Sequence, residues 1–266
     1  MKYSLIAIDI DGTIRSPTNE ISDRTRVAID QVINEGVVVT VATGRMFESA
    51  RLSTSVLGLK TPIVSFQGAH IADPVTGNVL WHLPLTRRQT SDTIAALDHW
   101  EGDVVAYVNN DVYVREITPW AEAYGKRNRG KLYLLSDFSS VIDLSPTRLL
   151  AVGDEDKIMC LEKKLQRQFG HSLHITRSLP TFCEILNPGA GKHKALEWLC
   201  SYLGIDDRKT VAFGNGYNDV HMLTWAGLGV AVGDSVQDVL NVADRIAPPL
   251  EEDGVAQILE EFLRGC

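Results

Sequence analysis

The sequence predicts an α/β fold in which a doubly wound, mostly parallel, Rossmann-like core sheet is interrupted by an inserted α+β domain. Towards both ends of the 266-residue chain, apolar β-branched segments alternate with helical ones, as in parallel sheets covered by helices. In the middle of the chain, strand-like segments adjoin one another instead, which is typical of an antiparallel sheet. We therefore expect a discontinuous core domain at 1–83 and 188–266, with a second domain at 84–187.

The first part of the core is predicted from apolar runs that are separated by helix signals. The expected strands are residues 3–10, 37–42 and 61–66, and the expected helices are 22–35 and 46–57. Ser22 is a suitable N-cap for the first helix, and Gly36 is a suitable stop signal. A hairpin that turns at Thr76–Asn78 is expected next.

The inserted domain is predicted as an antiparallel sheet with helices on one face. Its expected helices are 88–100, 119–124 and 155–170, and its expected strands are two within 103–117, then 148–154, 171–178 and 181–187. The α/β alternation then resumes. Strands are expected at 210–214 and 228–233, and helices at 192–204, 217–226, 236–244 and 255–263.

The composition of the chain excludes several classes of protein. A net charge of −8 at pH 7 opposes non-specific nucleic-acid binding, which depends on basic patches. No run approaches the roughly 18 apolar residues of a membrane span. Because Met1 leads directly into the first predicted strand, we expect no signal peptide. The four cysteines form no CxxC, so we expect free or buried thiols in a reducing compartment. A cytoplasmic, soluble protein is expected, as a monomer or a small homo-oligomer.

Three polar clusters follow predicted strands of the core. They are "DIDGT" at 9–13, "TGR" at 43–45 and "GNGYND" at 214–219. Ligand sites in open α/β sheets lie beyond the carboxyl ends of the strands. Because those ends share one edge of a parallel sheet, we expect the three clusters to converge.

Asp9 and Asp11 bring two negative charges close together, directly after a buried strand. Such a pair is costly unless a cation or a proton is present, and a hard cation such as Mg²⁺ would relieve the cost. One carboxylate can then attack phosphorus to form an aspartyl-phosphate, while the other protonates the leaving oxygen and later activates water. Gly12 allows a sharp turn there. The alternative is a pair of loop carboxylates that cap a turn.

The other two clusters supply candidate ligands for a phosphate group. Thr43 offers a hydroxyl and Gly44 a backbone N–H at the start of a helix, which is a favourable seat for an anion. Lys192, at the start of a later helix, can pair with a phosphate and with Asp9, or it can simply be solvated. Asn218 is a further candidate phosphate ligand, and its alternative role is helix capping.

These residues resemble the haloacid dehalogenase superfamily of phosphotransferases, specifically its Cof-like sugar-phosphatase branch. The resemblance covers nearly the whole chain, including "PGAGKHKAL" (188–196) and "DGVAQIL" (253–259), and it implies that the inserted domain is the cap of that branch. It also implies that Asp9 is the nucleophile, Asp11 the acid/base and Thr43 a phosphate ligand. Lys192 matches the lysine of the third motif.

The resemblance further implies a Mg²⁺ ion, bound by the Asp9 carboxylate, the Asp11 backbone carbonyl and the first acidic residue of the fourth motif. This chain departs from the pattern there, because it has Asn215. An amide oxygen still ligates Mg²⁺, but the site loses one formal charge. Asp219 remains as a candidate metal-site residue that holds metal-bound water, with helix capping as its alternative. A second departure is Gln67, where the family usually has Asn.

Three functions therefore compete. The leading one is a Mg²⁺-dependent phosphatase that acts on a small phosphorylated metabolite, with sugar phosphates as the preferred class. The second is a phosphatase of phosphorylated disaccharides or glycosides. The third is a phosphosugar-binding regulatory module with weak or no turnover, which only Asn215 favours.

Overall fold

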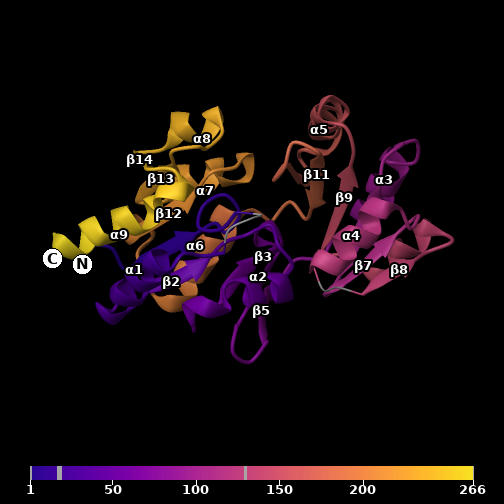
Figure 1. Ribbon diagram of the computed structural model, residues 1–266. Helices are drawn as coiled ribbons and strands as arrows, with labels where there is room; N and C mark the ends of the chain where they lie inside the picture. The colour runs from indigo at the N-terminus through magenta and orange to yellow at the C-terminus, as the bar shows by residue number, and fades with distance from the viewer. Residues whose placement is uncertain (1, 17–19, 129–130, 266) are drawn as a thin grey trace.

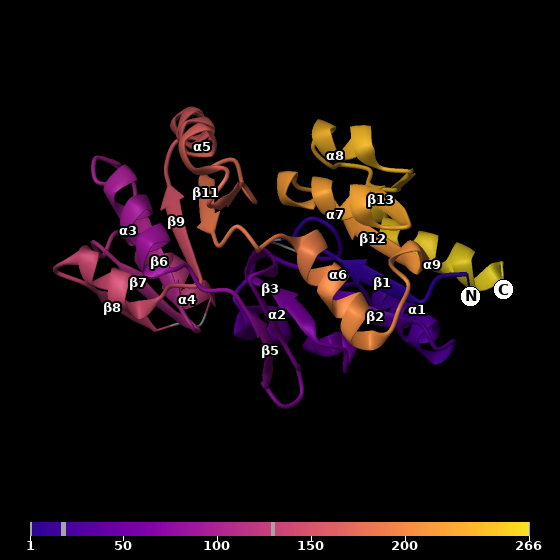
Figure 2. The ribbon, with the colours of Figure 1, turned by 180° about the vertical axis from the view of Figure 1, so that it is seen from behind.

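The computed structural model describes residues 2–16, 20–128 and 131–265. Figure 1 shows two lobes, and the first and last described elements both belong to the same lobe. The other lobe runs from helix α3 (Arg87–Ala96) to strand β11 (Phe182–Leu186), and the view from behind shows the same division (Figure 2). These bounds fall inside the predicted insertion at 84–187, whose limits stay a prediction.

The first lobe is built on a five-stranded sheet in the order β14-β13-β12-β1-β2, and every neighbouring pair is parallel. Its strands are β1 (Leu5–Ile8), β2 (Val38–Val41), β12 (Thr210–Gly214), β13 (Leu228–Val232) and β14 (Arg245–Ala247). The sequence analysis missed β14. This strand has three residues, and only its last one is fully buried, so it carries no apolar run.

Helices cover both faces of this sheet, as the doubly wound prediction requires. They are α1 (Asp23–Asn34), α2 (Phe47–Ser53) and α9 (Gly254–Arg264) on one face, and α6 (Lys192–Leu203), α7 (Val220–Trp225) and α8 (Gln237–Val242) on the other. Along β1, Ile6 and Ile8 pack towards the first group, while Leu5 and Ala7 pack towards the second. This alternation explains why the strand is apolar on both faces.

The third expected strand does not continue the parallel sheet. It is β3 (Ile63–Ser65), and it pairs antiparallel with β4 (His70–Ala72), which in turn pairs with β5 (Val79–His82). A single bridge between Ala42 and Val64 connects β3 with the end of β2. The chain turns back because Phe66 and Gln67 both have positive φ angles, 48° and 55°. The predicted hairpin around Thr76–Asn78 is confirmed as the connection between β4 and β5.

The second lobe contains a six-stranded sheet in the order β10-β11-β9-β6-β7-β8. Its elements besides α3 and β11 are β6 (Val104–Val108), β7 (Asp111–Val114), α4 (Pro119–Asn128), β8 (Leu132–Leu134), β9 (Arg148–Val152), α5 (Glu155–Phe169) and β10 (His174–Thr176). The predicted antiparallel pairing holds for all neighbours except β7 and β8, which are parallel. The sequence analysis missed β8, whose three residues include no buried one.

The expectation that the helices of this lobe lie on one face is wrong. Val104 and Ala106 pack towards α3 and α5, whereas Val105 and Tyr107 belong to a cluster that includes residues of α4 and, from the first lobe, Met46 and Phe66. The second face of the sheet is therefore closed by α4 and by the first lobe. Strand side chains alternate between faces, so this face needs an apolar cover of its own.

None of the helices in the described ranges combines the length and the apolar character that a membrane crossing requires.

Glycine at 68 is predicted to be required for the approach of the β3–β4 turn to α6. Gly68 and Gly36 both have positive φ angles, +87° and +81°, but an added Cβ at 68 would lie 2.3 Å from the Gly191 carbonyl oxygen, while one at 36 would meet nothing within 4 Å. Gly36→Ala should cost only the left-handed backbone strain, about 1–2 kcal/mol. Gly68→Ala should cost about 1–3 kcal/mol more, because of overpacking.

The measurement is the free energy of unfolding in urea for both variants. Equal losses would mean that the turn does not depend on this close approach.

Candidate active site

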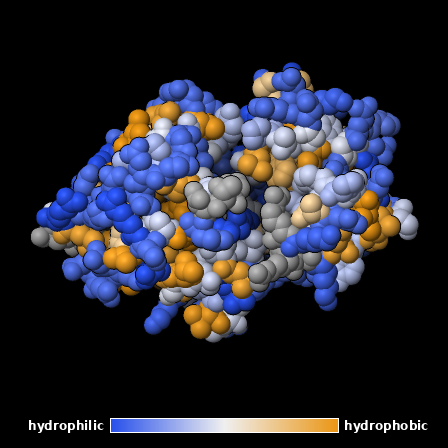
Figure 3. Space-filling model, viewed as in Figure 1, coloured by the Kyte–Doolittle hydropathy of each residue, from blue (hydrophilic) through white to orange (hydrophobic). Residues whose placement is uncertain are grey.

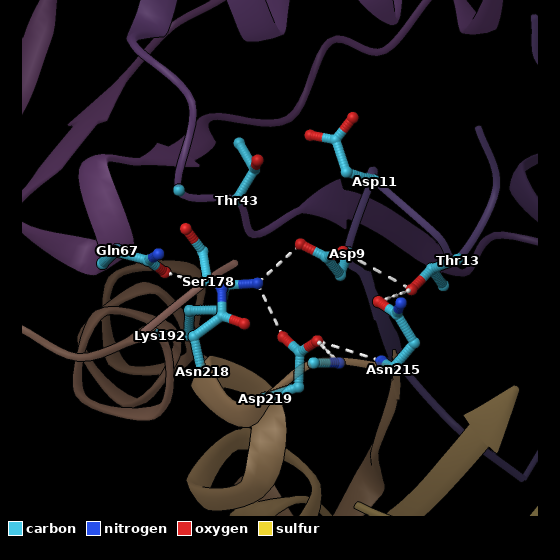
Figure 4. Close-up of polar contacts among 12 residues, drawn as sticks. Asp9, Asp11, Thr13, Thr43, Gln67, Ser178, Lys192, Asn215, Asn218 and Asp219 are labelled. Carbon is cyan, nitrogen blue, oxygen red and sulfur yellow. Dashed lines mark hydrogen bonds and ion pairs between the residues drawn. The ribbon is translucent and has the colours of Figure 1, made fainter. Parts of the chain in front are cut away.

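The three polar clusters converge, as the sequence predicts. The loops after β1, β2 and β12 meet at the carboxyl edge of the core sheet (Figure 4). The surface is hollowed between the two lobes (Figure 3). A separate cavity of about 740 Å³ lies on the outer side of the second lobe, between α3 and α5, and it contains none of the predicted site residues.

Lys192 forms the centre of the site. Its Nζ lies 2.6 Å from Asp9 Oδ1 and 2.6 Å from Asp219 Oδ1, and all three side chains are at most 7% exposed. Although burial opposes its charge, the Asp219 and Asp9 carboxylates raise the pKa of Lys192 above its usual range. The pairing with Asp9 was expected, and the solvated alternative is excluded by burial. The second pairing, with Asp219, was not foreseen.

Asp9 is held in an environment that makes its charge costly. Burial raises the pKa of Asp9 to about 7, Lys192 acts against this rise, and the neighbouring Asp219 and Asp11 add to it. Burial acts on the charged form of the carboxyl, and nearby negative charges act in the same direction. Asp9 can therefore be a nucleophile only where cations balance its charge.

The other oxygen of Asp9 lies beside Thr13, which also contacts Asn215. Thr13 Oγ1 donates to Asn215 Oδ1 over 3.2 Å and lies 3.5 Å from Asp9 Oδ2. Gly12, with φ +83°, allows this approach, because an added Cβ there would lie 2.1 Å from the Asn215 amide nitrogen. The structure thus brings the Asp9 carboxylate and the Asn215 amide oxygen to the same hydroxyl group.

Asp219 closes the loop that carries Asn215. Its Oδ2 accepts hydrogen bonds from the backbone N–H groups of Asn215 and Gly216, each over 3.0 Å, while its Oδ1 accepts from Lys192. Asp219 itself ends the 3₁₀ turn Tyr217–Asp219 and precedes α7. Its side chain thus closes the turn that precedes α7 and makes no cap bond to α7 itself, and its expected role at a metal site stays a prediction.

The carboxylate of Asp11 is not brought together with that of Asp9. It accepts two hydrogen bonds from the Arg45 guanidinium, both 2.7 Å, its side chain is 52% exposed, and it is directed away from Asp9 in Figure 4. Arg45 was not singled out from the sequence, although it is the third residue of "TGR". The bidentate contact between the Arg45 guanidinium and the Asp11 carboxylate is a strong form of ion pair.

The "TGR" loop leads into helix α2, as expected. The helix begins at Phe47 with Met46 as its N-cap, one residue after the predicted start, so Gly44 lies in the loop that precedes it. Thr43 is buried, and its hydroxyl accepts from the backbone N–H of Arg45 over 3.1 Å. In Figure 4 the Thr43 side chain is directed to the same side as that of Asp11.

Asn218 is connected to the second lobe through Gln67. Asn218 Nδ2 donates to Gln67 Oε1 over 3.0 Å, and Gln67 Nε2 donates to Glu184 Oε1 over 2.9 Å. Glu184 forms a buried ion pair with Arg148. The sequence analysis missed Arg148 and Glu184, although a lone charged residue in each of the apolar strands β9 and β11 was a usable signal, because such charges are buried only when paired.

A hard cation fits the donor atoms of this site only in part. Within the described ranges, no three His, Cys, Asp or Glu side chains are arranged to hold a metal ion. The oxygens that converge are Asp9 Oδ2 and Asn215 Oδ1, and both are hard donors of the kind that Mg²⁺ prefers. Because Mg²⁺ takes six oxygens, backbone carbonyls and water would have to complete its shell.

The fold and this site define a hydrolase, and comparison with known proteins agrees. The family profile of the haloacid dehalogenase-like hydrolases matches residues 6–259. The chain therefore belongs to this family, and the resemblance predicted from its motifs is confirmed.

Relatives and solved structures match over nearly the whole chain. A 5-amino-6-(5-phospho-D-ribitylamino)uracil phosphatase of Bacillus subtilis is 29% identical, with 98% of each chain covered. An HMP-PP phosphatase of Serratia proteamaculans is 26% identical, covering 98% of this chain and 96% of that one. A haloacid dehalogenase-like hydrolase from Bacteroides thetaiotaomicron superposes with a TM-score of 0.84 at 26% identity, covering 98% and 99% of the two chains. The expectation of an enzyme of the phosphatase class is confirmed.

Lys192 is predicted to be essential for the stability of the charged site. Lys192→Met leaves the two buried carboxylates unbalanced, and breaking such a pair costs about 3–5 kcal/mol. The loss should depend on pH, because removing the cation raises the pKa of Asp9 further above the unfolded value of about 3.9. A carboxyl whose pKa is higher in the folded than in the unfolded protein stabilises the fold at pH values below the unfolded pKa. This stabilisation is lost as pH rises towards the folded pKa.

The stability deficit of Lys192→Met should therefore grow as pH rises above about 7, the folded pKa of Asp9 in the wild type, because below that pH both proteins lose the same contribution from Asp9. Urea unfolding at pH 6 and pH 9 without divalent ions measures it. Lys194→Met is the matched control, because Lys194 is exposed and its side chain donates to the Pro188 carbonyl oxygen. A deficit that is the same at both pH values would contradict the proposed charge balance.

Proposed function

We propose that this phosphatase hydrolyses a small phosphorylated metabolite through an aspartyl-phosphate, with Asp9 as the nucleophile and Mg²⁺ as the cofactor. The observation that carries the proposal is the buried contact of Asp9 with Lys192 at the point where three loops converge. A carboxylate held by a buried ammonium group, beside further anion-binding groups, suits attack on a phosphate ester.

The reaction runs in two steps. A carboxylate oxygen of Asp9 forms a bond to phosphorus while the bond from phosphorus to the leaving oxygen breaks. Water then attacks the aspartyl-phosphate and releases inorganic phosphate, which restores Asp9. Lys192 stays protonated throughout and offsets negative charge, and Thr43, Gly44 and Asn218 are the proposed phosphate ligands.

Asp11 is the proposed acid/base. It gives a proton to the leaving oxygen in the first step and takes one from water in the second. In the structure its carboxylate is bound to Arg45, so it has to turn from Arg45 towards the substrate for this role. Its exposure of 52% leaves room for such a turn.

The proposed Mg²⁺ site consists of the Asp9 carboxylate, the Asp11 backbone carbonyl and the Asn215 amide oxygen, with Asp219 as the residue that would hold metal-bound water. A bound Mg²⁺ would neutralise charge on the phosphate and on Asp9. The two converging oxygens at Thr13 support this assignment. The relatives named above act on a phosphoribitylaminouracil and on HMP-PP, which supports a small metabolite; a sugar phosphate is our preferred class. A cytoplasmic location stays a prediction.

Asp9→Asn is expected to abolish turnover while the protein stays folded. The side chains have nearly the same shape, and an amide removes one charge from a crowded site. Loss of a covalent nucleophile costs a factor of about 10⁶ in kcat in well-studied proteases. The measurement is hydrolysis of p-nitrophenyl phosphate with and without Mg²⁺, alongside circular dichroism. Near-normal activity of the purified variant would exclude the mechanism.

Asn215→Asp is expected to lower the Mg²⁺ concentration that gives half-maximal activity. An added unit charge attracts a divalent ion, but repulsion from Asp9 and the cost of desolvation cancel part of the gain. We expect one or two tenfold steps, at about 1.4 kcal/mol each. Mg²⁺ titration of the activity, together with calorimetry of Mg²⁺ binding, measures the effect.

Superimposable curves for the wild type and Asn215→Asp would mean that residue 215 is not a ligand. Wild-type protein that binds phosphate but shows no turnover, with turnover restored in Asn215→Asp, would favour the binding module instead.

A further inference from the structure

An ion pair is buried at the seam between the two lobes. Arg148 on β9 and Glu184 on β11 are 3% and 0% exposed, and both lie on the sheet face that packs against the first lobe. The Arg148 guanidinium also lies over the ring of Tyr107 at 4.2 Å and over that of Phe66 at 5.5 Å. The pair is therefore held rigidly, with its charges out of water.

Both members of this pair reach loops of the candidate active site. Arg148 Nη1 donates to the Gly44 carbonyl oxygen over 2.7 Å. Glu184 accepts from Gln67 over 2.9 Å, and Gln67 accepts from Asn218 over 3.0 Å. One ion pair of the second lobe thus contacts the "TGR" loop directly and the loop after β12 through a single side chain.

Gln67 is fitted closely to this bridging position. It is 1% exposed and has a φ of 55°, a conformation that costs about 1–3 kcal/mol for a residue other than glycine. Gly44 leaves room for its amide, since a Cβ at 44 would lie 2.5 Å from Gln67 Nε2. An asparagine at this position would hold its amide about 1.5 Å, one C–C bond, further back, and so it would not span Glu184 and Asn218.

Glu184 also joins the loop between β10 and β11 to this network. Ser178 Oγ donates to Glu184 Oε1, the same oxygen that Gln67 uses. In the same loop, the Arg177 guanidinium lies 4.5 Å from the ring centre of Tyr217, the residue before Asn218. Two independent contacts therefore tie the second lobe to the Tyr217–Asp219 turn.

We propose that Gln67, supported by the Arg148–Glu184 pair, is a positioning residue that orients Asn218 and the Gly44 loop for phosphate binding. The position of the second lobe against the first then determines the affinity of the phosphate site. This inference rests on the proposed function, because it takes Gly44 and Asn218 as phosphate ligands. A purely structural ion pair would change stability, but it would leave phosphate affinity unchanged at temperatures where the protein is folded.

The test is calorimetric binding of inorganic phosphate, in Mg²⁺ buffer, to the wild type and to Gln67→Met. This variant keeps the side-chain length and removes both hydrogen bonds. We expect the Kd for phosphate to rise about tenfold, as for the loss of one or two buried hydrogen bonds. With p-nitrophenyl phosphate, KM should rise by a similar factor, and kcat should change less than KM.

Gln89→Met is the matched control. Gln89 also makes two amide hydrogen bonds, to Ser172 and Thr86, but within the second lobe and away from the site. It should leave the Kd for phosphate within about twofold of the wild type. If Gln67→Met leaves phosphate affinity at the wild-type value, or if Gln89→Met weakens it equally, the inference is overturned.

A double-variant cycle tests the route through Gln67. Glu184→Gln removes the charge at the far end, so it should weaken phosphate binding in the wild type and have a smaller effect in Gln67→Met, where only the direct contact of Arg148 with the Gly44 carbonyl remains to transmit it. Strictly additive effects of the two substitutions on the free energy of phosphate binding would contradict a route through Gln67. If the wild type lacks turnover but binds phosphate, the proposed function fails, while these binding measurements still test the inference.

Discussion

The site depends on one buried ammonium group that two carboxylates share. Lys192 contacts Asp9 and Asp219, each at 2.6 Å, and each carboxylate left without it would be an unbalanced charge in an almost dry environment. The three residues come from the end of β1, the start of α6 and the loop after β12, so the contact exists only when the parallel sheet has formed. The closely packed glycines at 68 and 191 allow α6 to begin where Lys192 reaches both partners.

The same constraint explains how the remaining polar groups are arranged. Asp219 uses one oxygen for Lys192 and the other for two backbone N–H groups, so it fixes the loop that presents Asn215. Asp9 uses one oxygen for Lys192 and turns the other towards Thr13 and Asn215. The lysine and the Thr13 hydroxyl thus contact different oxygens of Asp9, which suits its proposed role as a nucleophile beside Mg²⁺. Asp11 stands apart from this cluster and is balanced by Arg45 instead.

The second lobe contributes contacts to the loops of the candidate site. Its sheet is buried on both faces, and the face towards the first lobe carries a charged pair among apolar residues. A buried ion pair is weak evidence for stability, but it demands a specific geometry from its neighbours. Here those neighbours are the Gly44 carbonyl and the Gln67 amide, so the ion pair constrains the geometry of the loops that converge at Asp9.

The sequence by itself determined the core of the fold and the identity of the central residues. The strand at 5–8 ends in Asp9, the helix after Ser22 is capped by that residue, and Lys192 opens α6; each follows from local patterns of apolar residues, caps and glycines. Tertiary structure decided the partners. Periodicity contains no information on which distant charges meet, so the contacts of Lys192 with Asp219, of Asp11 with Arg45 and of Gln67 with Glu184 became visible only in the fold. It also decided the outcome for 61–66, because the backbone turn at Phe66 and Gln67 is set by distant neighbours. The same holds for β8 and β14, which are short, largely exposed edge strands whose pairing depends on neighbours far away in the sequence.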